Sequence, residues 1–276
     1  MVSLFDKIQE SKQYIDRILD HDAKIAIVLG TGLGDFAQSL IDIVEIPYSD
    51  IPHFPVSTVE SHQGKLIFGY KSGIPVIVMA GRFHCYEGYT AAEVTFPIRV
   101  LKALGINTIV LTNAAGGINP HFKEGDIVQV TDHINLMPDH PLRGPNDERL
   151  GPRFPDMMQA YDCDLIGVFK NISQNLNISI QSGVYLGLQG PSLETPSEYK
   201  MAHILGADLV GMSTIPEVIV AKQQGTKVAV FSIVSNICFP KSVLSETTVD
   251  EVISVVRRSS MKLCKILDEY FEKLKE

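Results

Sequence analysis

Three side chains suited to binding an anion follow one apolar segment of the chain. The segment IPVIVMA is followed by GRFHCYEGY, which contains Arg82, His84 and Tyr86 at alternate positions. On an extended backbone, alternate side chains point to the same face. A guanidinium group offers a fixed fork of donors that suits a phosphate. We therefore expect these three residues to line one polar pocket, with the two residues between them facing the core.

Simpler roles for two of these residues stay open. Arg82 is also compatible with a buried ion pair to Glu87 or to another acid. His84 is also compatible with a hydrogen-bonded core histidine. The position of both residues at the end of a buried strand favours the shared pocket.

A glycine-rich segment, LGTGLGD, follows the first apolar run and contains Gly30, Gly32 and Gly34. Glycines there let backbone N–H groups approach an anion at the start of a helix, and Thr31 adds a hydroxyl. A dinucleotide-binding loop needs its third glycine three residues after the second, where this chain has Asp35. The spacing favours a phosphate-holding loop, with a tight structural turn as the other possibility.

Small or polar residues also end four later segments. TNAAGG exposes the backbone N–H of Ala114, GPSLET places Glu194 just before a helix N-cap, VGMST contains Ser213, and SNICFP contains Asn236. Taken alone, Glu194 is equally a helix-end carboxylate, Ser213 a helix cap and Met212 a core side chain. Together they predict donors and acceptors gathered at the ends of strands.

The elements that must position these residues alternate along the chain. Eight apolar, β-branched segments are typical of buried strands: 24–30, 65–70, 74–81, 107–117, 126–136, 179–191, 208–212 and 227–236. We therefore predict one α/β domain over residues 1–276, with a mixed, mostly parallel sheet flanked by helices on both sides. In such folds ligands bind at the carboxyl ends of strands.

Helix starts are marked by threonines followed three residues later by glutamate, at Thr90, Thr195 and Thr248. Pro97 is expected to kink the helix that Thr90 opens. The last of these helices is expected to run over 248–275 and to pack its apolar face on the body of the protein. Two proline-rich segments, 46–64 and 137–155, are instead typical of long loops that act as lids or interface segments.

The composition excludes several classes of protein. A formal net charge of −8 over 276 residues argues against a nucleic-acid binder. No apolar run approaches a membrane span, and the first twenty residues have the pattern of an amphipathic helix and not of a signal peptide, so we expect a cytoplasmic protein. The four cysteines form no CxxC pair, which argues against a zinc site or a disulfide framework.

Six motifs, in order along the chain, resemble those of the trimeric purine nucleoside phosphorylases, in the family that also includes the methylthioadenosine phosphorylases. They are GTGLG, GRFHCYEGY, TNAAGG, GPSLET, VGMSTIPEV and SN. The resemblance implies phosphorolysis, in which phosphate attacks C1′ of a purine nucleoside and releases the base and ribose 1-phosphate. It implies no cofactor and no metal, since inorganic phosphate is a co-substrate, and it implies a homotrimer.

The resemblance also assigns roles to residues. Phosphate would contact Thr31, His62, Arg82, His84, the Ala114 backbone and Ser213, and the nucleoside would contact Tyr86, Phe154, Glu194, Val210, Met212 and Asn236. Asn236, Glu194 and His84 would act in catalysis. Phe154 would be contributed to the sugar pocket by a neighbouring subunit, although a local loop anchor is the simpler role.

Substrate preference follows from two positions. Glu194 accepting from N1–H and a 2-amino group favours 6-oxopurines, because adenine has no proton at N1. The methylthioadenosine branch usually has aspartate where this chain has Asn236, so inosine and guanosine are the expected substrates. Val249 stands where many members have a histidine near the 5′-hydroxyl, which keeps a 5′-modified nucleoside phosphorylase as the alternative. A nicotinamide-dependent oxidoreductase and a catalytically silent nucleoside sensor are more distant alternatives.

Overall fold

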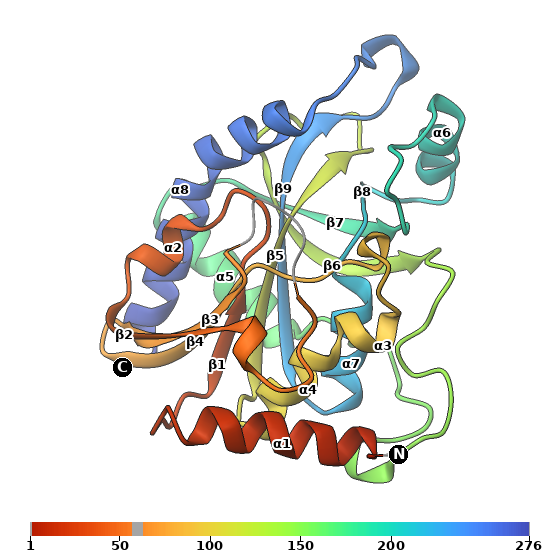
Figure 1. Cartoon of the computed structure of the whole chain (residues 1–276). Helices are drawn as coiled ribbons and strands as arrows, with labels where there is room; N and C mark the ends of the chain where they lie inside the picture. The colour runs from red at the N-terminus through yellow and green to blue at the C-terminus, as the bar shows by residue number, and fades with distance from the viewer. Residues whose placement is uncertain (1, 57–62, 276) are drawn as a thin grey trace.

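The strands form where the chain has its apolar, β-branched segments. The computed structural model describes residues 2–56 and 63–275 and places nine strands in one sheet (Figure 1). They are β1 (Ile25–Val28), β2 (Ile41–Pro47), β3 (Lys65–Lys71), β4 (Ile74–Ala80), β5 (Thr108–Gly117), β6 (Ile127–Asn135), β7 (Ile180–Gly187), β8 (Leu209–Gly211) and β9 (Lys227–Ile237). All eight predicted strands are present, and β2 is an addition.

The sheet is mixed, and part of it closes on itself. The strand order is β2-β3-β4-β1-β5-β8-β7-β6-β9, and β9 also pairs with β5, so that the last five strands form a closed ring of pairings. Five of the nine pairings are parallel: β1–β4, β1–β5, β5–β9, β6–β7 and β7–β8. The predicted mixed sheet is therefore confirmed, whereas its closure is a long-range feature that no local pattern indicates.

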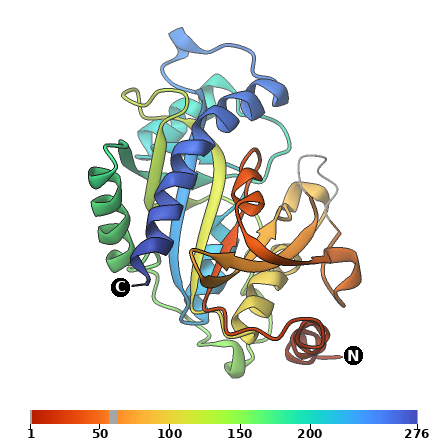
Figure 2. The ribbon, with the colours of Figure 1, turned by 90° about the vertical axis from the view of Figure 1, so that its left-hand side faces the viewer.

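Helices cover both faces of the sheet. They are α1 (Leu4–Asp16), α2 (Asp35–Gln38), α3 (Ala91–Val94), α4 (Phe96–Ala103), α5 (Cys163–Asn175), α6 (Pro196–Ile204), α7 (Ile215–Gln223) and α8 (Val249–Lys273). Helices α2, α5 and α8 pack together on one face, and α1, α3, α4 and α7 pack on the other. Figure 2 shows α8 running along the sheet beside α5, with α1 on the opposite side.

Two hydrophobic clusters explain why the strands are apolar without alternation. Alternate residues of β1 point into different clusters, Ala26 and Val28 toward α1, α4 and α7, and Ile25 and Ile27 toward α2, α5 and α8. Strand β1 therefore buries both of its faces. A fully buried side chain such as Phe231 contributes about 1.5–3 kcal/mol to folding by leaving water.

The helix starts follow the predicted capping pattern, with one difference. Thr90, Thr195 and Thr248 each accept from a backbone N–H three residues later, and the glutamate there returns a bond to the cap. Pro97 does not kink a continuous helix as expected. The helix opened by Thr90 ends after one turn, and Pro97 lies in the first turn of α4, where a missing N–H costs nothing.

The predicted loop over 46–64 is partly wrong. Its first residues belong to β2, an edge strand that pairs with β3 in antiparallel register and leaves most of its side chains exposed. The predicted loop over 137–155 contains only a short 3-10 turn at Glu148–Leu150. No helix in the described part of the chain has the length and apolarity needed to cross a bilayer.

Candidate functional site

Arg82 is the most deeply buried charge of the predicted site, with 2% of its surface exposed. Its Nη1 donates to the Thr112 carbonyl (2.8 Å) and to the hydroxyls of Ser213 and Thr214 (both 3.3 Å). Its Nη2 lies 2.9 Å from Oε2 of Glu217. The buried ion pair given as the simpler role of Arg82 is therefore present, and its acid is Glu217.

His84 is held by Glu87 and stacks on Tyr86. The backbone N–H of His84 donates to Glu87 Oε1 (2.8 Å), and its ring Nδ1 lies 3.0 Å from the same oxygen. Burial lowers the pKa of His84, while the bond to Glu87 opposes that shift. Burial also raises the pKa of Tyr86 to about 12. Both residues are therefore uncharged near neutral pH.

The extended backbone predicted through Tyr86 ends at His84. A 3-10 turn begins at Cys85 and includes Tyr86, so strict alternation stops there. Phe83 does face the core as expected, at 5.1 Å between ring centroids from Tyr48. The rings of His84 and Tyr86 still meet, with centroids 4.6 Å apart and planes 13° from parallel. The side chains share a pocket through stacking and not through strand alternation.

Residues after β8 complete this cluster. Met212, Ser213 and His84 line one small cavity. Ser213 and Thr214 have hydroxyl oxygens 3.0 Å apart, and Thr214 also accepts from Nδ2 of Asn113 (3.0 Å). Strand β8 runs antiparallel to β5, with Val210 opposite Gly116. The residues that follow β8 therefore continue in the direction of Asn113 on β5.

The glycine-rich loop reaches the same point of β5. Gly30 packs so closely that a Cβ there would lie 2.6 Å from the Thr112 carbonyl oxygen, the acceptor of the Arg82 bond. Thr31 follows in a half-buried turn, and Ala114 follows on β5, also half-buried. Glycine is required at position 30 because a larger residue would separate the loop from β5.

A second group of predicted residues surrounds Gly116 further along β5. Asn236 on β9 pairs with Gly116, and Val210 on β8 pairs with it from the other side. A Cβ on Gly116 would lie 2.5 Å from Cys238 Sγ and 3.2 Å from Val210 Cγ1. Asn236 accepts from Ser235 Oγ at 2.7 Å and donates to Cys238 Sγ at 3.2 Å.

Glu194 belongs to this second group through Tyr199. Glu194 precedes the N-cap Thr195, and the hydroxyl of Tyr199 on α6 hydrogen-bonds both its carboxylate and Cys238. Burial raises the pKa of Glu194, opposed by bonds from its own backbone N–H and from Tyr199. Burial also raises the pKa of the Cys238 thiol to about 12, which leaves it protonated. The group presents an amide and a carboxylate.

The structure therefore places the predicted residues in two groups along one strand. Arg82, Ser213 and Thr214 meet at Thr112–Asn113 of β5, and Asn236 and Val210 meet at Gly116. At about 3.3 Å per residue, the two positions are about 10 Å apart.

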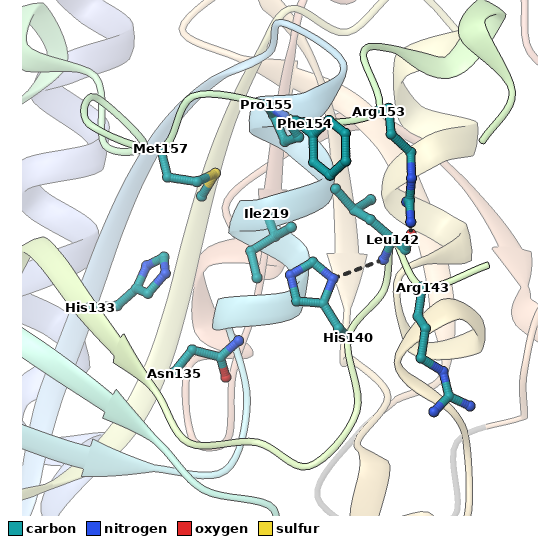
Figure 3. A pocket seen from close by; sticks show the side chains of 10 residues that line it. All are labelled: His133, Asn135, His140, Leu142, Arg143, Arg153, Phe154, Pro155, Met157 and Ile219. Carbon is teal, nitrogen blue, oxygen red and sulfur yellow. Dashed lines mark hydrogen bonds between the residues drawn. The ribbon is translucent and has the colours of Figure 1, made fainter. Parts of the chain in front are cut away.

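Phe154 and Val249 lie outside the two groups. Phe154 has 87% of its surface exposed and lines a cavity of ≈ 550 Å³ with His133, His140, Met157 and Ile219, among others (Figure 3). None of the residues described around this cavity belongs to either group. Val249 is exposed at the start of α8. His62 lies outside the described residues.

Sequence reasoning missed several residues of the site. Four residues contact predicted site residues although none of them ends an apolar segment: Glu217, Thr214, Tyr199 and Cys238. The available signal was their position: Thr214 and Glu217 lie in the motif VGMSTIPEV, and Cys238 lies two residues after Asn236. Within residues 2–56 and 63–275, no three histidine, cysteine or acidic side chains are placed to hold a metal ion.

Comparisons with known proteins show the family of this chain. A family model described as the Phosphorylase superfamily matches residues 24–272. Purine nucleoside phosphorylase 1 of Bacillus subtilis (strain 168) is 47% identical over 269 residues, which cover 97% of this chain and 99% of that protein. Purine nucleoside phosphorylase of Rattus norvegicus is 41% identical over 267 residues, which cover 94% of this chain and 92% of that protein.

Solved structures show the same fold. A schistosoma purine nucleoside phosphorylase in complex with hypoxanthine has a TM-score of 0.92 and 38% identity, with 99% of both chains covered. Isoform 2 of purine nucleoside phosphorylase from Schistosoma mansoni, in complex with cytosine and ribose-1-phosphate, has a TM-score of 0.91 and 37% identity. The alignment with it covers 97% of this chain and 96% of that chain.

Proposed function

Because this chain belongs to the Phosphorylase superfamily, we propose that it is a purine nucleoside phosphorylase that cleaves 6-oxopurine nucleosides such as inosine and guanosine. The reaction joins inorganic phosphate to C1′ of the ribose or deoxyribose and releases the free base. It uses phosphate as a co-substrate and no cofactor.

The observation that carries this proposal is the arrangement of two polar groups along β5. The group at Thr112–Asn113 contains a guanidinium and two hydroxyls, which are donors suited to a phosphate. The group at Gly116 contains Asn236 and, through Tyr199 and Cys238, Glu194, which are suited to a base edge. The distance of about 10 Å between the two positions leaves room for a sugar between phosphate and base.

The chemistry requires position and charge rather than a protein nucleophile. As the glycosidic bond stretches, the ribose gains oxocarbenium character, and a phosphate dianion held at C1′ stabilises it. Arg82, Thr31, Ser213 and the Ala114 backbone would hold that phosphate. Neutral His84 keeps its Nδ1 proton toward Glu87, which lets Nε2 accept the O–H of hydrogen phosphate. Tyr86, Val210 and Met212 would line the nucleoside.

Asn236 and Glu194 would set the preference for 6-oxopurines. An amide can donate to O6 and accept from a protonated N7, which stabilises the departing base. Ionised Glu194 can accept from N1–H, a proton that adenine lacks. A phosphorylase of 5′-modified nucleosides is the second candidate, because Val249, where a 5′-hydroxyl contact is expected, is apolar.

Base release from inosine, guanosine, adenosine and methylthioadenosine, measured with and without phosphate, tests the function. We expect release from inosine and guanosine that depends on phosphate. Asn236→Asp should lower kcat/KM for inosine relative to adenosine by about 10- to 100-fold, since it replaces a donor with an acceptor opposite O6. Release without phosphate would indicate hydrolysis, and an unchanged ratio would remove Asn236 from the base site.

The proposed assembly is a homotrimer in which Phe154 completes the sugar pocket of a neighbour. The support is that Phe154 is almost fully exposed and that its cavity lies apart from the site of its own chain. Exposed aromatic side chains of this kind are typical of interfaces. We also propose a cytoplasmic location, since all four cysteines are unpaired, as a reducing compartment requires.

A further inference from the structure

Thr214 has a backbone conformation that is unusual for its residue type. Its φ is 68° and its ψ is −52°, and the N–H of Ile215 donates to the carbonyl of Ser213 at 2.7 Å. These values describe a γ-turn with positive φ, which is rare and strained. A β-branched side chain makes the strain greater. Such strain persists only where surrounding contacts impose it, and it concentrates at functional sites.

The turn brings two consecutive hydroxyl groups together. In strands successive side chains diverge, whereas here the hydroxyl oxygens of Ser213 and Thr214 lie 3.0 Å apart. Thr214 is 2% exposed, so its hydroxyl must find all its partners within the protein. Those partners are Asn113, Arg82 and Ser213.

The partners determine the direction of each hydrogen bond. Nδ2 of Asn113 and Nη1 of Arg82 can only donate, and they donate to Thr214 Oγ1 at 3.0 and 3.3 Å. A hydroxyl has two lone pairs and one proton. Since these two partners are donors, Ser213 Oγ is the acceptor left for the Thr214 proton among the described partners of Thr214.

Ser213 is thereby left as a donor. Its oxygen accepts from Thr214 at 3.0 Å, and it shares with Thr214 the one Nη1 proton of Arg82 that is not donated to the Thr112 carbonyl. Within the described residues the Ser213 proton is left for the hydroxyl of Tyr185, which hydrogen-bonds the Ser213 side chain. A phosphate oxygen carries charge and is a stronger acceptor than a neutral hydroxyl, so a bound phosphate would take this hydrogen bond.

We propose that Thr214 is a positioning residue for phosphate: its hydroxyl donates to Ser213 and so directs the Ser213 proton toward the anion. This inference rests on the proposed function, because it concerns the same phosphate site. Thr214 itself need not touch the phosphate. Its role is to set the polarity of the hydrogen bonds and to hold Ser213 against Arg82.

The test uses variants of Thr214 in the full chain. Thr214→Val keeps the shape of the side chain and removes the hydroxyl, and Thr214→Ser keeps the hydroxyl. We expect Thr214→Val to raise the KM for phosphate by about 10- to 100-fold, as expected for losing a donor to a charged group. The KM for inosine should change by less than about three-fold, and Thr214→Ser should stay within about three-fold of wild type for both.

Two further variants separate this role from general effects on folding. Thr226→Val is the matched control, because Thr226 is also buried and its Oγ1 has no hydrogen-bond partner within the described residues. It should leave both KM values unchanged. Thr214→Gly relieves the positive φ and lacks the hydroxyl, so it should be folded in thermal denaturation and yet bind phosphate as weakly as Thr214→Val.

The measurements distinguish failure of this inference from failure of the proposed function. Phosphate binding measured by calorimetry tests the inference even if the protein releases no base from inosine, an outcome that would defeat the proposed function alone. Wild-type affinity for phosphate in folded Thr214→Gly or Thr214→Val overturns the inference. Equal losses for phosphate and inosine also overturn it, since they indicate a merely structural role. A phosphate-specific loss that serine restores supports it.

Discussion

The guanidinium of Arg82 forms a buried ion pair with Glu217 in the candidate site. Glu217 lies 2.9 Å away and is equally buried, and burial raises its pKa while attraction to Arg82 opposes that rise. A buried pair of this kind contributes little net stability, yet losing one partner costs about 3–5 kcal/mol. The pair therefore serves to hold the guanidinium fork in a defined place. A phosphate adds a second anionic partner to a group that is already oriented.

The proposed role of Glu194 in binding the base predicts a pH dependence that can be measured. Because burial raises its pKa above the ordinary 4.5, its carboxylate is ionised only above that raised value. Only the ionised form accepts from N1–H, so affinity for hypoxanthine should be complete at high pH. It should be lost as the pH falls through the raised pKa, at a higher pH than for a free glutamate. Calorimetric titrations from about pH 8 down to about pH 5 measure this.

Tyr199→Phe is the matched control for that measurement. The hydroxyl of Tyr199 donates to Glu194 and thereby lowers its pKa. Without that hydroxyl the pKa of Glu194 rises further, so the loss of hypoxanthine affinity should move to higher pH. A shift to lower pH, or an affinity that does not depend on pH, would exclude Glu194 as the acceptor for N1–H.

At the scale of elements, the side chain of Gln223 connects the loop that carries Phe154 to helices α4 and α7 by hydrogen bonds. Gln223 at the end of α7 accepts from Arg99 of α4 at 3.0 Å. Its Nε2 donates to Asn146 Oδ1 at 3.3 Å and to the Pro152 carbonyl at 3.1 Å. Burial lowers the pKa of Arg99 to about 10, so its charge already lies in a costly environment. The loop thus depends on a buried polar network.

Gln223→Leu should destabilise the protein by about 1–3 kcal/mol, because it removes an acceptor from a buried arginine without changing the size of the side chain much. Denaturant unfolding measures this change. Hydrogen exchange should also become faster in residues 146–154 than in the strands. The neighbouring Gln224→Leu is the control, since the side chain of Gln224 makes one long hydrogen bond within the described residues, at 3.5 Å to the Ile98 carbonyl. Equal effects of the two substitutions would contradict the role of Gln223.

Some of these elements can be predicted from the sequence, and others cannot. Buried strands such as 74–80 have a local sequence signature, since residues on both of their faces are apolar. Helix starts such as Thr248 have a different one, a threonine followed three residues later by a glutamate. Strand β2 was missed because its side chains are mostly exposed and it leads into a proline-rich segment. The contacts of Thr214 and Glu217 with Arg82 depend on the pairing of β8 with β5. Pairings between distant segments leave no periodic pattern in either partner.

At the scale of the whole molecule, the exposed Phe154 predicts that one chain alone is incomplete. Phe154 has 87% and Met158 has 88% of its surface exposed, and both lie on the segment between β6 and α5. Light scattering should give three times the mass of the chain, 30.4 kDa. Phe154→Ala should raise the KM for nucleoside about ten-fold or more, as for loss of an aromatic anchor at an interface, while the trimer persists.

Met158→Ala is the control for that experiment, because it removes an equally exposed apolar side chain that has no predicted contact with the sugar. It should leave the KM for nucleoside near the wild-type value. A monomeric protein with full activity would contradict both the assembly and the role of Phe154.

The pairing of β9 with β5 has a consequence for synthesis on the ribosome. Strand β9 emerges more than one hundred residues after β5, an interval on the order of 10 s at ordinary rates of translation. During that interval β5 lacks the neighbour that covers one of its edges, and such an edge is a template for aggregation. The nascent chain is therefore at its most vulnerable just before residue 237 is made, and chaperones that bind unfinished chains should act in that window.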